Sequence, residues 1–224
     1  MSHPYYPKIL VLPHYVAPTL TTVPLLGIFF SVVGAILLAS WAISKRYNSS
    51  LSIQHRLIYL WFVLCGFIHF FFEGYFAVTH ATIASRTDLF GQLWKEYSKA
   101  DSRYMTSDSF VVIMESITAL LWGVGSFVMA YAIVWDTPYR YILQFLVSTG
   151  QLYGDVLYYL TTLFEGAPHA RPEGIYFWFY FVFLNAFWIV IPIALMWQSW
   201  DVIVERMSSS SGKTTRSSLK RKTK

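Results

Sequence analysis

Hydrophobic residues gather into five long windows along the chain, separated by short polar stretches. The windows are residues 25–44, 57–79, 109–135, 141–164 and 175–200. An α-helix needs roughly 20 mostly apolar residues to cross the hydrocarbon of a bilayer, and each window is long enough. The pattern predicts an all-α integral membrane protein with five transmembrane helices in a bundle.

The composition agrees with this prediction and excludes several other classes of protein. Of the 224 residues, 55% are hydrophobic and only 13% are charged, whereas a soluble globular domain carries roughly 25% charge. The one cysteine, Cys65, excludes an internal disulfide and any site that needs several thiolates. The sequence therefore favours a membrane protein without a cysteine-based metal centre.

Charge at the ends of the windows predicts an orientation and three regions. Residues 1–24 form an N-terminal segment, residues 25–206 the five-helix domain, and residues 207–224 a basic tail that we expect to be disordered and cytoplasmic. We interpret the first window as a retained helix, because no basic stretch precedes it as in a secretory signal. With five spans, eleven of the seventeen Lys and Arg residues fall on the side of the C-terminus. Positive charge favours the cytoplasmic side, so the N-terminus is expected outside or in a lumen.

Four ionisable residues lie inside the windows: His69, Glu73, Glu115 and Asp155. Each costs roughly 2.5–3.5 kcal/mol in a membrane helix even on lenient insertion scales, so each needs a reason. His69 and Glu73 are four residues apart and share one helix face. They could serve chemistry or merely join two helices. A zinc pair fits the spacing, but no thiolate and no second histidine within a helix turn support it.

Glu115 begins a helix face that also carries Thr118, Trp122 and Gly125. A glutamate this far inside an apolar helix should be protonated or paired. A neutral carboxylic acid in a dry pocket is a proton donor. The structural alternative is a hydrogen bond between helices.

Polar or aromatic residues follow one face of each of the last two windows. The fourth window carries a polar stripe that must face other helices or a cavity, made of Gln144, Ser148, Gln151, Asp155 and Tyr158. Such groups often hold helices together. The fifth carries Trp178, Phe181, Asn185, Trp188 and Pro192, a face that suits a flat apolar ligand with one hydroxyl and a transient positive centre. These features fit proton chemistry on a lipid and fit a proton-coupled transporter equally well.

Several strings in the chain resemble those of the emopamil-binding protein family, the sterol Δ8,Δ7-isomerases. They are CGFIHFFFEG from Cys65, LWKEYSKADSRY from Leu93, MESITA from Met114, QLYGDVLY from Gln151 and YFWFYFVFLNAFW from Tyr176. They occur in the family's order and spacing, up to about residue 200. One departure is Gly123-Val124, where many members have Gly-Pro.

The resemblance implies a multi-pass enzyme of the endoplasmic reticulum membrane that moves a sterol double bond from Δ8 to Δ7. Its sterol pocket would lie between the second to fifth helices. An acid protonates C9, a cation forms at C8, and a base removes a proton from C7. The reaction is redox-neutral, so no cofactor and no metal are expected.

The residue roles and partners carried over from the family are also expectations. His69, Glu73 and Glu115 supply the acid and the base, in an order that the sequence leaves open. Trp188 would stabilise the cation, and Asn185, Thr118, Arg103 and Tyr104 would bind the sterol, with Asp155 and Gln151 behind them. The expected partners are a Δ8-sterol, inhibitory amphipathic amines and membrane lipid, with no nucleic acid; a homodimer stays open.

Two other functions are weighed against the isomerase. A non-catalytic sterol- or amine-binding receptor of the same superfamily would share the bundle but need not keep His69, Glu73, Glu115 and Trp188 together. A transporter would be expected to show an inverted repeat with interrupted helices, and the sequence shows neither.

Overall fold

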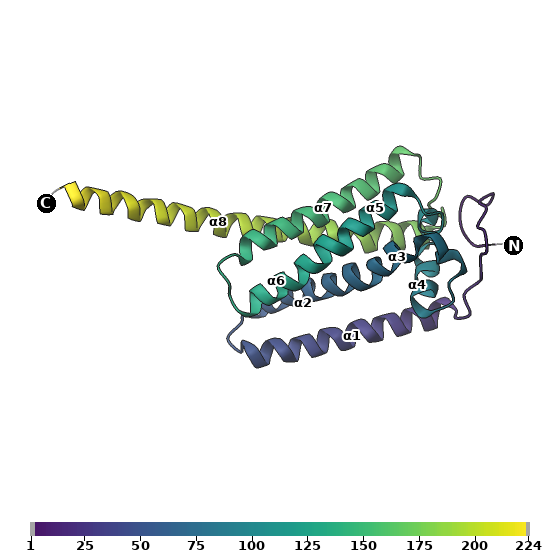
Figure 1. Ribbon diagram of the computed structural model, residues 1–224, viewed down its shortest axis with the longest axis horizontal. Coiled ribbons are helices and arrows are strands. Elements are labelled where there is room, and N and C mark those ends of the chain that lie inside the picture. Colours follow the sequence, from purple (N-terminus) through teal and green to yellow (C-terminus); the bar gives the residue numbers. More distant parts are fainter. Residues whose placement is uncertain (1–2, 223–224) are drawn as a thin grey trace.

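The computed structural model describes residues 3–222, with side chains up to residue 209, and this part is almost entirely helical (Figure 1). The α-helices are α1 (Thr22–Tyr47), α2 (Ile53–Phe67), α3 (Gly74–Thr79), α4 (Leu89–Tyr97), α5 (Ser109–Ile117), α6 (Val124–Val134), α7 (Arg140–Phe164) and α8 (Leu184–Lys222). Two short 3₁₀ helices are η2 (His80–Ser85) and η3 (Ser102–Met105). The described residues contain no β-strand, and an isolated bridge pairs Asp101 with Ala170.

Among the described residues, four helical stretches are long and apolar enough to cross a membrane. They are Thr22–Tyr47, Ile53–Ser85, Ser109–Val134 and Ile175–Ser209. The fifth predicted span, α7, has 25 residues and is also long enough. It is not among the four because its polar stripe lowers its mean hydropathy. The structure therefore supports an all-α membrane protein, and the fifth span stays a prediction.

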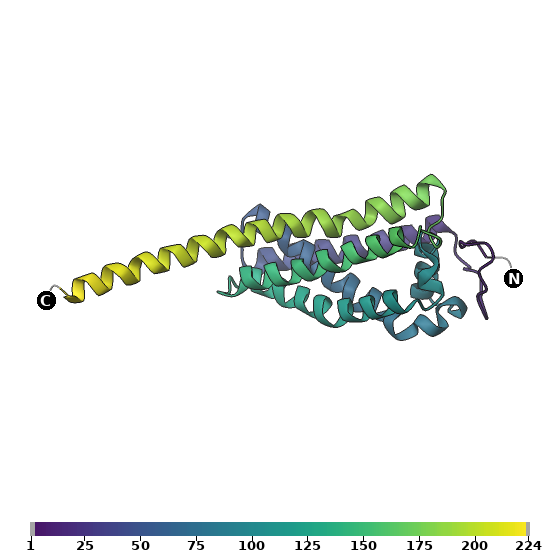
Figure 2. The same cartoon turned by 90° about the horizontal axis from the view of Figure 1, so that it is seen from above.

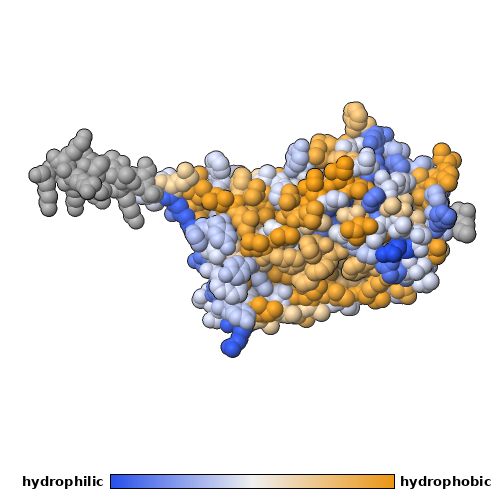
Figure 3. All heavy atoms as spheres, viewed as in Figure 1, coloured by the Kyte–Doolittle hydropathy of each residue, from blue (hydrophilic) through white to orange (hydrophobic). Residues whose placement is uncertain are grey.

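The long helices lie side by side in an elongated bundle (Figures 1 and 2). The most extensive contacts join α7 to α8 and α2 to α6, whereas α1 lies along one edge. Only 6% of the apolar stretch of α1 is buried in the protein. Hydrophobic side chains cover the middle of the face shown in Figure 3, and hydrophilic ones gather towards its ends. This distribution is typical of a protein whose middle is surrounded by lipid.

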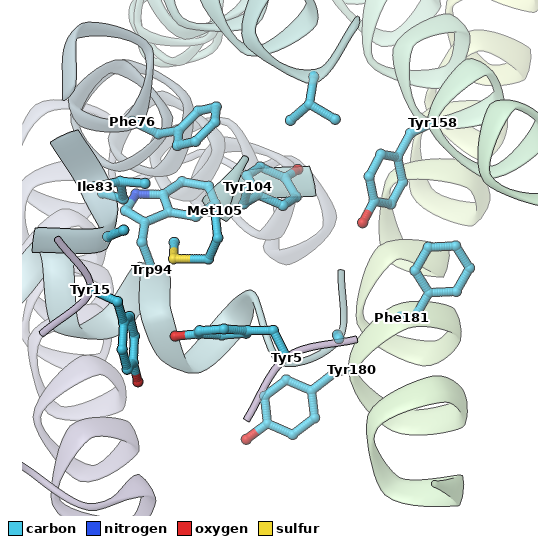
Figure 4. Packing of buried hydrophobic residues seen from close by; sticks show 13 residues of the cluster. Tyr5, Tyr15, Phe76, Ile83, Trp94, Tyr104, Met105, Tyr158, Tyr180 and Phe181 are labelled. Carbon is cyan, nitrogen blue, oxygen red and sulfur yellow. The ribbon is translucent and has the colours of Figure 1, made fainter. Parts of the chain in front are cut away.

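One end of the bundle is closed by the N-terminal segment, α4 and η3. Buried aromatic side chains from these segments and from the adjoining helices form a cluster that we call the aromatic cap (Figure 4). Its members are Tyr5, Tyr15, Phe76, Trp94, Tyr104, Tyr158, Tyr180 and Phe181. Lys95 of α4 ties the segments together, because its Nζ donates to the carbonyls of Val16 at 2.6 Å and Arg86 at 2.5 Å. Burial lowers the pKa of Lys95 below its ordinary value.

Three stretches of the long helices are π-helical, with backbone bonds to the fifth residue: η1 (Ile68–Glu73), η4 (Thr118–Gly123) and η5 (Ile175–Phe183). η1 and η4 pack against each other. A Cβ atom on Gly123 would lie only 2.8 Å from the backbone nitrogen of Phe70. Only glycine therefore allows the two backbones to approach so closely.

Helix α8 is drawn to Lys222 and projects beyond the bundle (Figure 1). The division into three regions, with disorder over residues 207–224, stays a prediction. Residues 207–224 are rich in Ser, Lys and Arg and contain no proline, which would interrupt a helix. The predicted disorder of residues 223–224 lies outside the described residues.

Candidate active site

The first π-helical turn, η1, carries both His69 and Glu73. His69 is 2% exposed, and its Nδ1 lies 2.8 Å from Glu73 Oε2. Two N–H groups approach its Nε2, from Gln151 Nε2 at 3.0 Å and from Trp188 Nε1 at 3.3 Å. An indole N–H can only donate, so His69 Nε2 must accept. The imidazole is therefore the neutral tautomer with its hydrogen on Nδ1, which donates to Glu73.

The second carboxyl, Glu115, lies at the end of α5 directly before the second π-helical turn, η4. It is buried, and the hydroxyl of Tyr104 donates to its Oε1 at 2.5 Å. The carboxyl groups of Glu73 and Glu115 lie close enough to interact. The structure thus brings His69, Glu73 and Glu115, from two helices, into one group that we call the carboxyl cluster, in which His69 and Glu115 are buried and the Glu73 side chain is 13% exposed. π-Helical turns occur frequently at functional sites, which agrees with this placement.

Trp188 and Asn185 lie one helical turn apart on α8. Trp188 touches the carboxyl cluster through its N–H, and its ring centroid is 6.0 Å from that of His69. The amide of Asn185 is bound by the protein itself. Its Oδ1 accepts from Tyr97 OH at 3.2 Å, and its Nδ2 donates to the carbonyl of Phe181 at 2.7 Å.

Arg103 lies next to the aromatic cap, and its side-chain hydrogen bonds are made outside the carboxyl cluster. Its guanidinium forms a bidentate pair with Asp101, whose side chain is fully buried. It also donates to the hydroxyls of Thr161 and Thr162 on α7. These contacts join the loop before α5 to α7 and so hold the neighbouring Tyr104 against Glu115. No hydrogen bond between Arg103 and the carboxyl cluster is described, so its role in binding substrate stays a prediction.

The remaining predicted site residues surround the cluster less directly. Gln151 donates to His69, as described above. Thr118 opens η4 and is half-buried, and no hydrogen bond of its hydroxyl is described. Asp155 lies one turn from Gln151 on α7, near enough to Glu115 for their charges to interact, and its Oδ2 is buried with no partner among the described residues.

Two further residues at the site were not singled out in the sequence. Tyr97 binds Asn185 from α4, and the fully buried Cys65 lies one helical turn before His69. The position of Cys65, four residues before His69 on the same face, was a signal for its proximity. Tyr97 gave no such signal, because a loop and η3 separate α4 from the spans.

The two cavities described in the structure lie away from the carboxyl cluster. One, of about 400 Å³, lies between α1, α2 and α6 and is lined by apolar residues such as Val63, Phe67 and Phe127. The other, of about 310 Å³, lies by the N-terminal segment and η2. Neither is the predicted sterol pocket, which therefore stays a prediction. Among the described residues, no three His, Cys, Asp or Glu side chains are grouped to hold a metal ion.

Comparison with known proteins places the chain in a family. A family model for EBP, described as EXPERA (expanded EBP superfamily), matches residues 89–199. The chain is 46% identical over 196 residues to the mouse 3-beta-hydroxysteroid-Delta(8),Delta(7)-isomerase, covering 87% of this chain and 85% of the relative. It is 37% identical over 213 residues to a probable isomerase of the same name from Oryza sativa, covering 95% and 97%. A protoglabretal synthase of Citrus sinensis is 36% identical over 166 residues, covering 74% and 78%.

The matched region contains α4, Tyr104, Glu115, α7 and most of the last span, and the longer matches add His69 and Glu73. These matches cover most of both chains and so include the region of the carboxyl cluster. The chain belongs to the EBP family.

Proposed function

We propose that this protein is a sterol isomerase of sterol biosynthesis that moves the ring double bond from Δ8 to Δ7. The observation that carries the proposal is the carboxyl cluster. The buried carboxyl group of Glu115, the largely shielded carboxyl group of Glu73 and a neutral imidazole meet in an apolar bundle. These groups can add one proton to a substrate and remove another. Relatives that match most of this chain are named for this reaction.

The hydrogen bonds favour one division of roles between the two carboxyl groups. His69 Nδ1–H donates to Glu73, and this supports the ionised form of Glu73 as the base. Tyr104 donates to Oε1 of Glu115, which leaves Oε2 free to carry a proton as the acid. Glu115 would protonate C9, a cation would form at C8, and Glu73 would remove a proton from C7 as the C7–C8 double bond forms. Proton and charge balance, and no redox cofactor is required.

The sterol would lie between the helices that surround the cluster, with α7 as the fifth span. At 1.5 Å per residue, α7 measures roughly 37 Å, enough to cross the bilayer. Its polar stripe is turned to the bundle, while neighbours such as Ile142, Leu146 and Thr149 are exposed. An apolar pocket with a cation-stabilising ring would also bind amphipathic amines, because an ammonium resembles the C8 cation.

We place the protein in the endoplasmic reticulum membrane with the C-terminus of α8 in the cytoplasm. The support is the excess of Lys and Arg at the α8 end of the bundle. The aromatic cap then lies on the lumenal side.

The proposal is tested by supplying a Δ8-sterol to membranes that contain the protein and analysing the sterols by gas chromatography. The expected result is a Δ7 product of unchanged mass. Binding of sterol and amine without conversion would instead indicate the non-catalytic receptor. The higher identity and coverage of the sterol isomerases favour a sterol substrate over the function named for the protoglabretal synthase.

Replacing Trp188 tests how the cation is stabilised. Trp188→Leu keeps apolar bulk but removes the π face, whose interaction with a desolvated cation is worth about 2 kcal/mol. Turnover should fall roughly 30-fold, and the affinity for a cationic amine should fall in parallel. Trp188→Phe is the matched control: it keeps a ring but loses the N–H that holds His69.

The two variants separate the ring from the N–H. The Phe variant should retain most amine affinity while its turnover still falls. If Trp188→Leu weakens a neutral sterol and a cationic amine equally, Trp188 is only a wall of the pocket.

A further inference from the structure

The polar stripe of α7 is not fully paired within the protein. Each of its five members has a buried polar atom without a hydrogen-bond partner among the described residues. These atoms are Gln144 Oε1, Ser148 Oγ, Gln151 Oε1, Asp155 Oδ2 and Tyr158 Oη. All five lie on one face of one straight helix, so the unpaired atoms form a row rather than a scatter.

Helices that face the stripe contribute more atoms of the same kind. Ser126 of α6 and Ser199 of α8 are both fully buried, and their hydroxyls have no partner among the described residues. The indole N–H of Trp61 on α2 is also unpaired, and its ring lies 5.5 Å from that of Trp188. Pro192 adds to this, because it has no N–H for the carbonyl of Trp188 one turn earlier in α8.

Buried polar atoms in proteins are almost always paired, and where no protein group is available ordered water takes the place. A single unpaired atom could be a local irregularity. A row of unpaired atoms along α7, with unpaired hydroxyls on the neighbouring helices, fits a chain of hydrogen-bonded water molecules. From Gln144 to Asp155 the helix rises about 16 Å, which at hydrogen-bond spacing is on the order of five waters.

The row meets the carboxyl cluster and leads away from it in one direction. Gln151 donates to His69 of the cluster, and Asp155 lies one helical turn further along α7. Beyond Tyr158 the path is closed by the aromatic cap (Figure 4). The buried Asp101–Arg103 pair lies on the same side, with the Arg103 guanidinium 4.9 Å from the centre of the Tyr158 ring. At the other end, Gln144 donates at 2.9 Å to Gln198 Oε1, and Gln198 is only half-buried.

We propose that this row is a proton path, which we call the α7 relay, and that it connects the carboxyl cluster with the water at the end of the bundle where α7 begins. The proposal rests on the isomerase function above. Each turnover leaves Glu115 without its proton and Glu73 with the proton from C7. The relay carries the proton on Glu73 out to water and brings a new proton from water to Glu115 through Asp155. The protonation of the cluster is then the same as before the turnover. The proton added at C9 therefore originates in the solvent, not in an earlier substrate molecule.

Deuterium labelling distinguishes the relay from a direct handover between the two adjacent carboxyl groups. A Δ8-sterol with two deuterium atoms at C7 is converted over many turnovers in ordinary water, and the product is weighed by mass spectrometry. With the relay, the abstracted deuterium is lost to water, and the product keeps one deuterium. With direct handover, that deuterium is passed to C9 of the next substrate, and the product keeps two.

Ser148→Val should interrupt the relay, because it replaces the hydroxyl by methyl groups that fill the space for water. The doubly labelled product should then appear, and kcat should fall about tenfold as resetting becomes slow. Thr149→Val is the matched control on the next residue, since Thr149 is exposed and its hydroxyl bonds only to the carbonyl of Phe145.

Asp155→Asn gives a second, independent interruption if Ser148→Val fails to fold, because it keeps the size of the side chain and removes its transferable proton. A doubly labelled product from the wild type would overturn the relay, and so would a singly labelled product from both interrupted variants. Absence of any Δ7 product from the wild type would overturn the isomerase function itself, which is a different result.

Discussion

Replacing Glu115 by glutamine is expected to lower turnover by about 10²- to 10⁴-fold, the usual contribution of a general acid or base. The amide is nearly the same size and can still accept the hydrogen bond from Tyr104 at its oxygen. It has no proton to give to an alkene, which is a weak base and needs a neutral, well-placed acid. The measurement is conversion of a Δ8-sterol by the purified variant at saturating substrate.

Binding separates lost chemistry from lost folding in this experiment. Glu115→Gln should bind a cationic amine and should unfold at a temperature near that of the wild type. Tyr104→Phe is the comparison variant: it removes one hydrogen bond to Glu115 but leaves the proton, so it should lose much less turnover. A glutamine variant with near-normal turnover would exclude Glu115 as acid or base.

Replacing Asp101 by asparagine is expected to destabilise the fold by about 3–5 kcal/mol, because it leaves the buried guanidinium of Arg103 without its counter-ion. Both side chains of this pair are almost fully buried, with 0% of Asp101 and 2% of Arg103 exposed. The loss is measured by thermal unfolding in detergent, and it should lower turnover as well, since the loop that carries Tyr104 loses its attachment to α7.

The exposed pair Arg171–Glu173 provides the control. Its N–O distance of 2.9 Å is close to the 2.7 Å of the buried pair, but 47% of the Glu173 side chain is exposed. Solvent-exposed pairs contribute at most about 1 kcal/mol, so Glu173→Gln should hardly change the unfolding temperature. Equal losses from the two substitutions would show that the Asp101–Arg103 pair does not hold the cap to the bundle.

The sequence was sufficient to predict the contacts that depend on spacing within one helix. His69 and Glu73 are four residues apart and do form a hydrogen bond. The hydrophobic windows correspond to the long helices of the bundle. Contacts between segments that are distant in the chain could not be predicted from spacing: the bond between Tyr97 and Asn185 joins a short helix of the cap to α8.

Not every predicted helix face is the buried one, although His69 and Glu73 do meet within the π-helical turn η1. The predicted face Glu115, Thr118, Trp122, Gly125 is shifted by one residue, since the buried side below Glu115 is Ala119, Gly123 and Ser126. Thr118, Trp122 and Gly125 are half-buried. In the fifth window Trp178 leaves its predicted face: it is 66% exposed while Phe181 is 1% exposed, because π-helical η5 has more residues per turn than the α-helical count assumes.

The close approach of η1 and η4 at Gly123 and Phe70 means that main-chain contact fixes the spacing of the two carboxyl groups. Apolar residues on the lipid side of these helices take no part in that main-chain contact, so they are free to vary. Gly123 itself has no such freedom. Even alanine there would push the two turns apart and would separate a proton donor from its acceptor without altering either. Among related sequences, substitutions should therefore be frequent on the membrane-facing surface and nearly absent at Gly123.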